Sequence, residues 1–400
     1  VKRPVAINDI HPLWTKHPNE CSDEDYKEFY RKVFHDYKEP LFWIHLNMDY
    51  PFNLKGILYF PKINTEYESI EGTIKLYNNQ VFVADNIKEV IPEFLLLLKG
   101  VIDCPDLPLN VSRSALQNDG FVKKISDYIT KKVADKLSGM CKTDKENYEK
   151  YWDDINPFIK FGCLKDEKFA EKMNDYIIFK NLDGKYLTLK ECLEENKEKH
   201  ENTVFYVTDE IEQSQYINMF KNEGIDAVIL THNIDQPFIT NMESKNENLK
   251  FKRIDADLSD SFKEETSKDE LKDMTEKLSK TFKDALGNEN LTVSVEKLKD
   301  ASISSMITLS EESRRMQDMM KMYGMAGMDP NMFGAEGQTL VLNANNDLVK
   351  YVAEHTDGEN TKIICEQLYD LAMLSHAPLS PEQMTGFIAR SNKIMELLAK

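Results

Sequence analysis

The sequence predicts an α/β protein of the layered α+β kind, and three observations support this prediction. Short apolar runs rich in branched and aromatic residues alternate with helical patterns in two separate stretches of the 400-residue chain. A strongly helical stretch, from residue 120 to about 161, lies between them. The end of the chain is a run of amphipathic helices. We therefore expect two α/β subdomains joined by a helical segment, then a small α+β C-terminal domain that ends in a helical bundle.

The same patterns give the expected domain boundaries. The first α/β subdomain covers 1–130, and a helical connector covers 131–160. The second α/β subdomain covers 161–258, after which the composition turns polar and the apolar pattern is lost. The C-terminal domain is then 259–400. A chain of 400 residues agrees with two or three domains, at roughly 150 residues each.

The elements of the first subdomain follow from apolar periodicity. One helical face carries Tyr26, Phe29, Tyr30, Val33 and Phe34. Two prolines mark a loop over 103–110. The predicted elements are a helix over 26–37, strands over 41–48 and 52–60, a hairpin of 73–77 and 80–83 across Asn78-Asn79, a helical segment over 92–99 and a helix that begins near 112.

The second subdomain alternates buried-type strands with helices. Its strands are predicted over 176–179, 203–207 and 227–230, and its helices over 189–199 and 214–222. Gly224 follows the second of these helices and is a typical stop signal.

The C-terminal domain begins with a regular amphipathic helix. Ser267 and Glu270 form a capping box ahead of apolar residues that recur to Leu286. Strands are predicted over 291–295 and 302–309, and helices over 347–354, over 359–375 and from Ser380 to the end. The last two helices carry an apolar set that we assign to dimerisation: Ile364, Leu368, Leu371, Met384, Phe387, Ile388, Ile394, Met395 and Leu398. On the pattern alone, a homodimeric four-helix bundle and packing back onto the preceding layer are equally compatible with these faces.

The composition excludes several classes of function. The chain has 51 basic and 69 acidic residues, a formal charge of −18, which repels nucleic-acid backbones and anionic membranes. Its densest early apolar run, Phe94 to Leu98, is far shorter than the roughly 20 residues of a membrane span. Residue 1 is Val and no secretion signal follows it, so we expect the sequence to be part of a longer protein or a processed product.

The cysteines and histidines give no case for a metal site. No CxxC pair and no zinc-type spacing occurs among them. The pattern predicts free thiols in a reducing cytoplasm. The six cysteines are Cys21, Cys104, Cys141, Cys163, Cys192 and Cys365.

A methionine cluster is the first candidate for function. Seven of the chain's 17 methionines fall between Met316 and Met332, among glycines that interrupt a helix after Tyr323. Methionine is flexible and polarisable, which suits a surface that accepts many shapes. The alternative is ordinary core filling by a helix. The residues that we assign to partner binding here are Met316, Met319, Met320, Tyr323, Met325, Met328 and Phe333.

The second candidate is the segment from Leu107 to Gln117. A proline-bearing loop leads into a helix that begins near Ser112, which places Arg113 in the first turn and Gln117 on the same face. An arginine at a helix N-terminus is unfavourable for the helix dipole unless it faces an anion. It could reach a phosphate as an arginine finger does, or form a structural bridge to a carboxylate.

These residues resemble the heat shock protein 90 chaperones, most closely the bacterial HtpG type. The resemblance covers nearly the whole chain, and the Leu107–Gln117 motif is its strongest part. The other matching segments are Pro12 to Lys16, Lys55 to Pro61, Ile91 to Phe94 and Leu98 to Asp103.

The resemblance implies the middle and C-terminal parts of a three-part chaperone whose N-terminal ATP-binding domain is absent here. It implies that Arg113 reaches the ATP γ-phosphate held by that domain, that Gln117 supports the catalytic loop and that Asn110 lies in it. Magnesium would accompany ATP in the full-length protein. This segment alone would bind no nucleotide and hydrolyse none.

The resemblance also implies partners. They are a second copy bound through the C-terminal helices, non-native client proteins and a cooperating chaperone. Trp14 aligns with a residue of client contact and domain communication, and local packing is its alternative role. The methionine cluster falls where the family binds clients.

Two other functions are alternatives to a chaperone. An independent phosphotransferase or hydrolase that uses Arg113 would need a glycine-rich phosphate loop, and neither GxxxxGK[ST] nor GxGxxG occurs in the sequence. A passive dimeric scaffold, with the methionines in its core, is the alternative that stays open.

Overall fold

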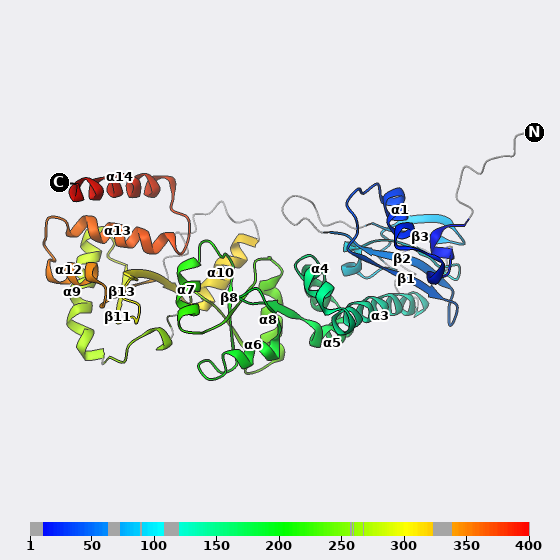
Figure 1. The fold of residues 1–400 in the computed structure, drawn as a ribbon, viewed down its shortest axis with the longest axis horizontal. Helices are drawn as coiled ribbons and strands as arrows, with labels where there is room; N and C mark the ends of the chain where they lie inside the picture. Colours follow the sequence, from blue (N-terminus) through cyan, green and yellow to red (C-terminus); the bar gives the residue numbers. More distant parts are fainter. Residues whose placement is uncertain are drawn as a thin grey trace, which may run out of the picture. The chain divides into compact units, whose positions relative to one another are not determined.

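The computed structural model describes residues 11–62, 73–88, 90–107, 120–256, 258, 260–266, 268–322 and 338–399, with the side chains of 268 and 317–322 left out. The chain forms two compact units, Val1–Ile178 and Phe179–Lys400 (Figure 1). Each unit mixes helices with small sheets, so the α/β class predicted from the sequence is confirmed.

The first unit is built on a five-stranded mixed sheet. Its strands run in the order β1-β2-β5-β3-β4, with β3 and β5 parallel and the other neighbours antiparallel. The strands are β1 (Phe42–Met48), β2 (Leu54–Phe60), β3 (Ile74–Asn78), β4 (Val81–Asp85) and β5 (Lys99–Asp103). Four of them match predicted strands. The central strand β5 was not predicted, and only its first residue fell within the helical segment expected over 92–99.

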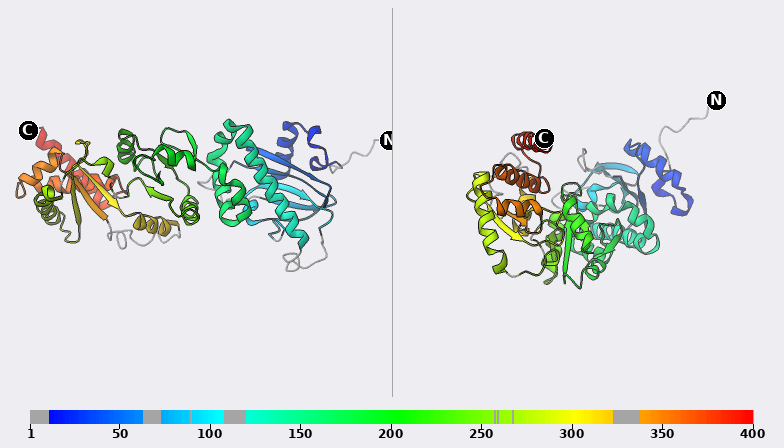
Figure 2. Two further views of the ribbon diagram at one scale, coloured as in Figure 1. Left: turned by 90° about the horizontal axis from the view of Figure 1, so that it is seen from below. Right: turned by 60° about the vertical axis from the view of Figure 1, so that its left-hand side comes forward.

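Helices cover both faces of this sheet. Side chains alternate along β2, so the ring of Tyr59 packs against Tyr30 of α1 with centroids 5.0 Å apart, while Phe60 packs edge-on against Phe158 of α4 with centroids 5.2 Å apart. This explains why β2 is almost continuously buried. The helices are α1 (Asp23–Phe34), α3 (Gly120–Thr143), α4 (Lys145–Lys165) and α5 (Glu167–Met173), with 3-10 turns η1 (Leu13–Thr15), η2 (Pro18–Glu20), η3 (Glu93–Leu97) and η4 (Asn174–Tyr176). Figure 2 shows α3 and α4 crossing the sheet.

The second unit begins with a three-layered α/β part. Its parallel sheet has the order β10-β8-β9, beside a two-stranded sheet of β6 and β7. Its elements are β6 (Ile178–Lys180), β7 (Tyr186–Thr188), α6 (Leu189–Glu195), β8 (Thr203–Val207), α7 (Ser214–Asn222), β9 (Ala227–Ile229), α8 (Asp235–Lys245), β10 (Lys250–Arg253) and η5 (Asp260–Phe262). The predictions for β8 and α7 match to the residue. Gly224 has a φ of 62°, as its predicted role as a helix stop requires.

The rest of the second unit packs helices on a sheet of order β11-β13-β12. Helix α13 lies between this sheet and α14 (Figure 1). The elements are α9 (Lys268–Leu286), β11 (Thr292–Glu296), β12 (Ser305–Leu309), α10 (Glu311–Met322), β13 (Gln338–Asn343), α12 (Asp347–Glu354), α13 (Thr361–Leu374) and α14 (Pro381–Leu398). The prediction lacked β13, again the central strand. Leu278 and Phe282 of the predicted amphipathic helix are fully buried.

The boundary predicted near residue 258 falls inside a shared core. Phe205 and Phe220, which precede it, cluster with Phe262, Met306 and Val341, which follow it. The two parts of the second unit therefore bury side chains against each other. The division at 258 and the other predicted boundaries stay predictions.

Candidate functional site

The predicted catalytic residues Asn110, Arg113 and Gln117 lie outside the described residues. The structure does describe the chain on both sides of their segment, 108–119. Strand β5 and the turn over 104–107 lead into it, and α3 follows it from Gly120. These flanks determine where the segment starts and ends.

Asp103, the last residue of β5, is a buried anchor on the incoming side. Its side chain is 5% exposed. Its Oδ2 accepts a hydrogen bond from the indole Nε1 of Trp14 at 3.1 Å and another from the backbone N of Gln80 at 2.9 Å. A buried carboxylate needs such donors, so Asp103 ties η1 and the β3–β4 hairpin to the end of β5.

Asn78, at the end of β3, holds the turn that follows. Its amide nitrogen Nδ2 lies 3.1 Å from the carbonyl oxygen of Pro105, 3.3 Å from that of Cys104 and 3.5 Å from that of Leu107. The turn is also closed by its own bond, from Leu107 N to Cys104 O at 3.2 Å. One side chain therefore contacts three of the four carbonyl groups of the turn.

The loop before β2 touches both flanks. The backbone N of Asn53 donates to Oδ2 of Asp106 at 2.8 Å. The ring of Phe52 packs edge-on against Phe121, in the first turn of α3, with centroids 5.5 Å apart. Residues 52 and 53 thus bridge the chain just before and just after the segment 108–119.

Trp14 is packed rather than exposed. Its side chain is 6% exposed and lies against Phe29 and Tyr77, with ring centroids 5.8 and 4.9 Å away. This position favours the local-packing role over client contact, because a client would reach the indole only if the cluster opened. Client contact by Trp14 stays a prediction.

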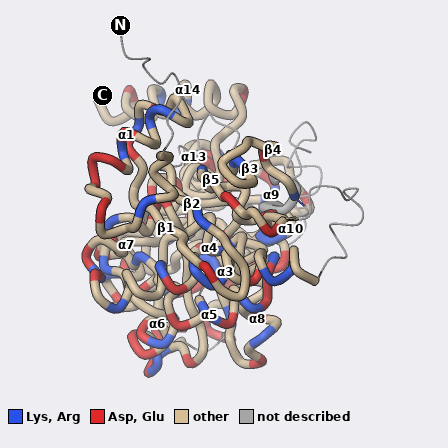
Figure 3. The backbone as a smooth tube through the Cα atoms, turned by 90° about the vertical axis from the view of Figure 1, so that its right-hand side faces the viewer, with Lys and Arg blue, Asp and Glu red and all other residues tan. Residues whose placement is uncertain are grey.

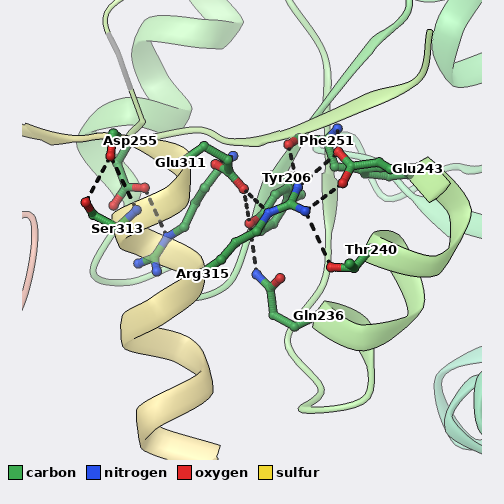
Figure 4. Close-up of polar contacts among 11 residues, drawn as sticks. Tyr206, Gln236, Thr240, Glu243, Phe251, Asp255, Glu311, Ser313 and Arg315 are labelled. Atoms are coloured by element: carbon green, nitrogen blue, oxygen red, sulfur yellow. Dashed lines mark hydrogen bonds and ion pairs between the residues drawn. The ribbon is translucent and has the colours of Figure 1, made fainter. Parts of the chain in front are cut away.

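The base of α10, from which the methionine cluster extends, is fixed by arginine contacts (Figure 4). Arg315 donates from Nη1 to Oε2 of Glu243 on α8 at 2.6 Å, and from Nη2 to Oε1 at 3.0 Å. It also donates from Nη2 to Phe251 O at 3.0 Å and from Nε to Glu311 Oε1 at 3.0 Å. These bidentate contacts raise the pKa of Arg315 against the opposing effect of burial, so its charge is permanent.

Arg314 adds an interior ion pair. Its Nη2 lies 2.9 Å from Oδ2 of Asp255, and Nε of Arg253 lies 3.0 Å from Oδ1 of the same carboxylate. Asp255 follows β10, at the carboxyl edge of the parallel sheet, where α/β folds commonly bind ligands. In this chain the arginine of α10 fills that place.

The methionine cluster is only partly described. Met316 is 50% exposed. Met319 and Met320 belong to α10, but their side chains lie outside the described residues. Tyr323, Met325, Met328 and Phe333 lie outside them entirely. The exposure of Met316 agrees with a surface role at the start of the cluster, and the other assignments stay predictions.

The comparisons with known proteins decide the family. The family model described as Hsp90 protein matches residues 1–400. The chain belongs to the Hsp90 family. It is 42% identical over 368 residues to the chaperone protein htpG of Bacteroides fragilis strain YCH46, with 88% of this chain and 53% of the relative covered. It is 41% identical over 363 residues to chaperone protein HtpG of Porphyromonas gingivalis, covering 86% of this chain and 52% of the relative.

A more distant relative extends the match. Chaperone protein HtpG of Sulfurimonas denitrificans is 27% identical over 407 residues, covering 98% of this chain and 63% of the relative. The chain spans about half the length of the first two relatives. The resemblance to HtpG-type members of the Hsp90 family, inferred from the sequence motifs, is therefore confirmed.

The residues assigned to dimerisation in this Hsp90 chain divide into two groups. Leu368 of α13 is buried in the core of the C-terminal sheet and its helices, and Ile364, Met384 and Phe387 pack against that core. Ile394 is half-buried. The outward group has exposed fractions of 43% for Leu371, 53% for Ile388, 58% for Met395 and 83% for Leu398. Most of this set on α13 therefore packs inward, while α14 keeps an exposed apolar face. Dimerisation through these residues stays a prediction.

The described residues contain no group of three or more His, Cys, Asp or Glu side chains placed to bind a metal ion. All six cysteines are free thiols. Within the described ranges, no helix combines the length and apolarity that crossing a membrane requires. Figure 3 shows Lys and Arg interspersed with Asp and Glu along the helices.

Sequence reasoning missed three of the residues that shape these sites. Asn78 was assigned only to a hairpin turn, and Arg314 and Asp255 were not singled out. The signal for Arg314 was present in part, because two adjacent arginines precede the methionine cluster. Nothing local in the sequence pairs Asp255 with it.

Proposed function

We propose that the chain is the middle and C-terminal part of an ATP-dependent molecular chaperone, in which Arg113 acts on the γ-phosphate of ATP bound by an N-terminal domain. The observation that supports this most is the frame around the segment 108–119. Buried Asp103 and the bridge of residues 52 and 53 hold both flanks of a segment that carries an arginine motif of the Hsp90 family.

The chemistry assigned to Arg113 is charge stabilisation. Phosphoryl transfer to water spreads negative charge over the oxygens of the γ-phosphoryl group, and a planar guanidinium can meet two of them at once. Such help requires fixed geometry more than acid–base chemistry. Gln117 would support the same loop.

Client binding is proposed for the methionine cluster. Met316 is half exposed at the point where α10 leaves its arginine anchor, and six more methionines follow. The anchor gives the cluster a defined origin, while the flexible side chains suit varied apolar surfaces of non-native proteins. Homodimerisation through the open face of α14 would place two such surfaces in one molecule. We place this molecule in the cytoplasm, with a cooperating chaperone as a further partner.

The proposal is tested in the full-length protein that includes the nucleotide-binding domain. Arg113→Ala should lower kcat for ATP hydrolysis by about 100-fold or more and leave KM within about twofold, because the arginine acts in the transition state. Arg113→Lys should not restore kcat, since an ammonium lacks the planar fork. Lys123→Ala is the matched control, because it removes one positive charge from an exposed position on α3.

A wild-type kcat in Arg113→Ala would refute this role.

The passive scaffold makes a separate prediction: a scaffold with its methionines in the core should not suppress aggregation of a heat-unfolded protein such as malate dehydrogenase. The chaperone should suppress it, and Met316→Ser should weaken the suppression. Light scattering at equal concentrations measures the difference.

A further inference from the structure

The side chain of Asn78 continues the hydrogen bonding between β3 and β5 beyond their last backbone–backbone hydrogen bond. Strands β3 and β5 pair in parallel up to Tyr77 and Asp103, and Cys104 N donates to Tyr77 O at 3.1 Å. Past that bond the ladder ends. The next carbonyl groups of the chain, those of Cys104, Pro105 and Leu107, turn toward the amide nitrogen of Asn78 at 3.3, 3.1 and 3.5 Å.

The position of Asn78 is itself well defined. It pairs with Val81 across a two-residue turn whose central residues, Asn79 and Gln80, have φ angles of 51° and 66°. Positive φ at both places is the signature of a tight type I′ hairpin. The pairing of β3 and β4 also shifts register between Leu76 and Tyr77, an irregularity of the kind that redirects a side chain.

We propose that Asn78 is a positioning residue for ATP hydrolysis: it fixes the turn over 104–107 and thereby the point from which the segment carrying Arg113 starts. The inference rests on the proposed function. Leu107 is the last described residue of the turn, and Arg113 follows six residues later in the sequence, so the turn sets the point from which that segment begins. A misplacement of about 1 Å can lower a rate by as much as 100-fold.

The sharpest variant is Asn78→Asp. It keeps the shape of the side chain but replaces the donating amide with an oxygen that faces three carbonyl oxygens, so it repels the turn that Asn78 holds. Asn78→Ala removes the donors without adding repulsion. Asn47→Asp is the matched control, because it makes the same substitution at an exposed position on β1 of the same sheet.

The kinetic test uses the full-length protein with ATP. Asn78→Asp should lower kcat at least tenfold and Asn78→Ala by a smaller factor, with KM within about twofold of wild type because the nucleotide pocket is unchanged. Asn47→Asp should stay within about twofold of wild type in kcat and in KM. In an Arg113→Ala background, Asn78→Asp should have no further effect, because both changes remove the same contribution.

A second readout needs no activity. Cys104 belongs to the turn, is 1% exposed and has its pKa raised by burial to about 11. Its alkylation by iodoacetamide should be at least tenfold faster in Asn78→Asp than in wild type or in Asn47→Asp. Equal thermal unfolding midpoints of the variants would show that the hairpin itself stays folded.

Three outcomes would count against the inference. It fails if Asn78→Asp and Asn78→Ala keep kcat within twofold while Arg113→Ala loses it, and in that case the proposed function stands. It fails if Asn78→Asp lowers kcat equally in the Arg113→Ala background, because its effect then bypasses the arginine. Wild-type kcat in Arg113→Ala refutes the arginine's proposed role, and the inference falls with it.

Discussion

The guanidinium of Arg314 lies 2.9 Å from the carboxylate of Asp255, with the two side chains 1% and 0% exposed. The pair joins the helix that begins the methionine cluster to the edge of a parallel sheet. Arg253 lies on the other carboxylate oxygen at 3.0 Å, so one buried anion is shared by two cations. A buried pair of this kind is costly to break, because removing one partner leaves an uncompensated charge in the interior.

Loss of the shared anion should therefore loosen α10. Asp255→Asn keeps the shape but removes the charge that two buried guanidinium groups share, and we expect it to lower the free energy of unfolding of the second unit by about 3–5 kcal/mol. Arg314→Met should cost less, because Arg253 still balances the carboxylate. Hydrogen exchange of the amides of 311–316 should accelerate in both variants.

Glu312→Gln is the control, since it changes the charge of an exposed residue on the same helix. Urea unfolding followed by far-UV circular dichroism reports both units. The three tryptophans, Trp14, Trp43 and Trp152, all lie in the first unit, so their fluorescence reports that unit alone. If Asp255→Asn and Glu312→Gln lower the free energy of unfolding equally, the buried charges of Asp255 and its arginines do not stabilise the second unit, and the prediction is wrong.

The first unit offers a matched glycine pair. A Cβ at Gly162 of α4 would lie 2.7 Å from an atom of the Phe169 ring and 2.9 Å from the Phe94 ring, whereas a Cβ at Gly139 of α3 meets nothing within 4 Å. Gly162→Ala should therefore destabilise the unit by about 1–3 kcal/mol through overpacking. Gly139→Ala should stabilise it by up to about 1 kcal/mol through helix propensity.

Urea unfolding followed by tryptophan fluorescence measures both changes in the intact chain. The test depends on the two changes in the free energy of unfolding having opposite signs, because both variants add one methyl group to a helix. A stabilising Gly162→Ala would mean that the Phe94 and Phe169 rings move aside at little cost.

Most helices and strands could be predicted from the sequence, including β8, the central strand of the parallel sheet. The central strands of the five-stranded sheet and of the other three-stranded sheet could not, and edge strand β10 and helix α8 were not predicted either. Amphipathic periodicity placed α9 and α12, because one side of each helix faces a core. Strand β5 is short, contains Gly100 and follows an apolar run that has a helical pattern. Strand β13, with Leu340 to Leu342, follows a glycine-rich segment, so the sequence pattern does not show where the strand begins. Both are buried between two partners, so no alternation of polar residues marks them.

The candidate sites show the same limit. Local motifs identified the Arg113 segment and the methionine cluster, because their residue types are unusual at that spacing. The contacts of Asn78 with the turn over 104–107, and of Asp255 with Arg314, join residues far apart in the chain. Such pairs depend on strand order and helix placement, which one sequence does not specify.

The pH dependence of the first unit should include a contribution from His45. Burial lowers the pKa of His45 below its ordinary value of 6.5, against an opposing backbone contact at Trp14, and Tyr26 Oη lies 2.8 Å from its Nδ1. Below pH 6.5 the unfolded chain then binds more protons than the folded one. The free energy of unfolding should therefore fall as the pH drops, by at most about 1.4 kcal/mol per pH unit.

His45→Gln should flatten this part of the profile. Urea midpoints from tryptophan fluorescence at pH 7.5, 6.5 and 5.5 give the comparison. If the difference in urea midpoint between wild type and His45→Gln is the same at all three pH values, His45 has the same pKa in the folded and unfolded states, and the prediction is wrong.

Thiol reactivity should separate the cysteines by burial. Burial raises the pKa of Cys104 to about 11 and those of Cys192 and Cys365 to about 12, and the thiolate is the reactive form. Only Cys21 and Cys141 are half-buried rather than buried. Iodoacetamide at pH 8 should therefore modify these two first, as peptide mass spectrometry can show. Denatured chain, with all six modified, is the control, and fast native labelling of Cys192 would contradict the prediction.

The open face of α14 predicts the oligomeric state. No residue of this helix, which the structure describes in full, is buried. Its inner side is held to α13 by Met384 and Phe387 and by ion pairs of Arg390 with Asp370 and Glu366. The attachment leaves Ile388, Met395 and Leu398 exposed in a row that a second copy can cover. We therefore expect a dimer at micromolar concentration.

Sedimentation equilibrium distinguishes a dimer of about 93 kDa from the monomer of 46.4 kDa. Replacing Ile388, Met395 and Leu398 by Ser should yield the monomer, because it removes the apolar area that drives association. Replacing the exposed polar residues Asn392 and Lys393 by Ser should leave the dimer intact. A monomeric wild-type chain would instead mean that α14 serves only to cover α13, and the proposed chaperone would then lack its joint between two copies.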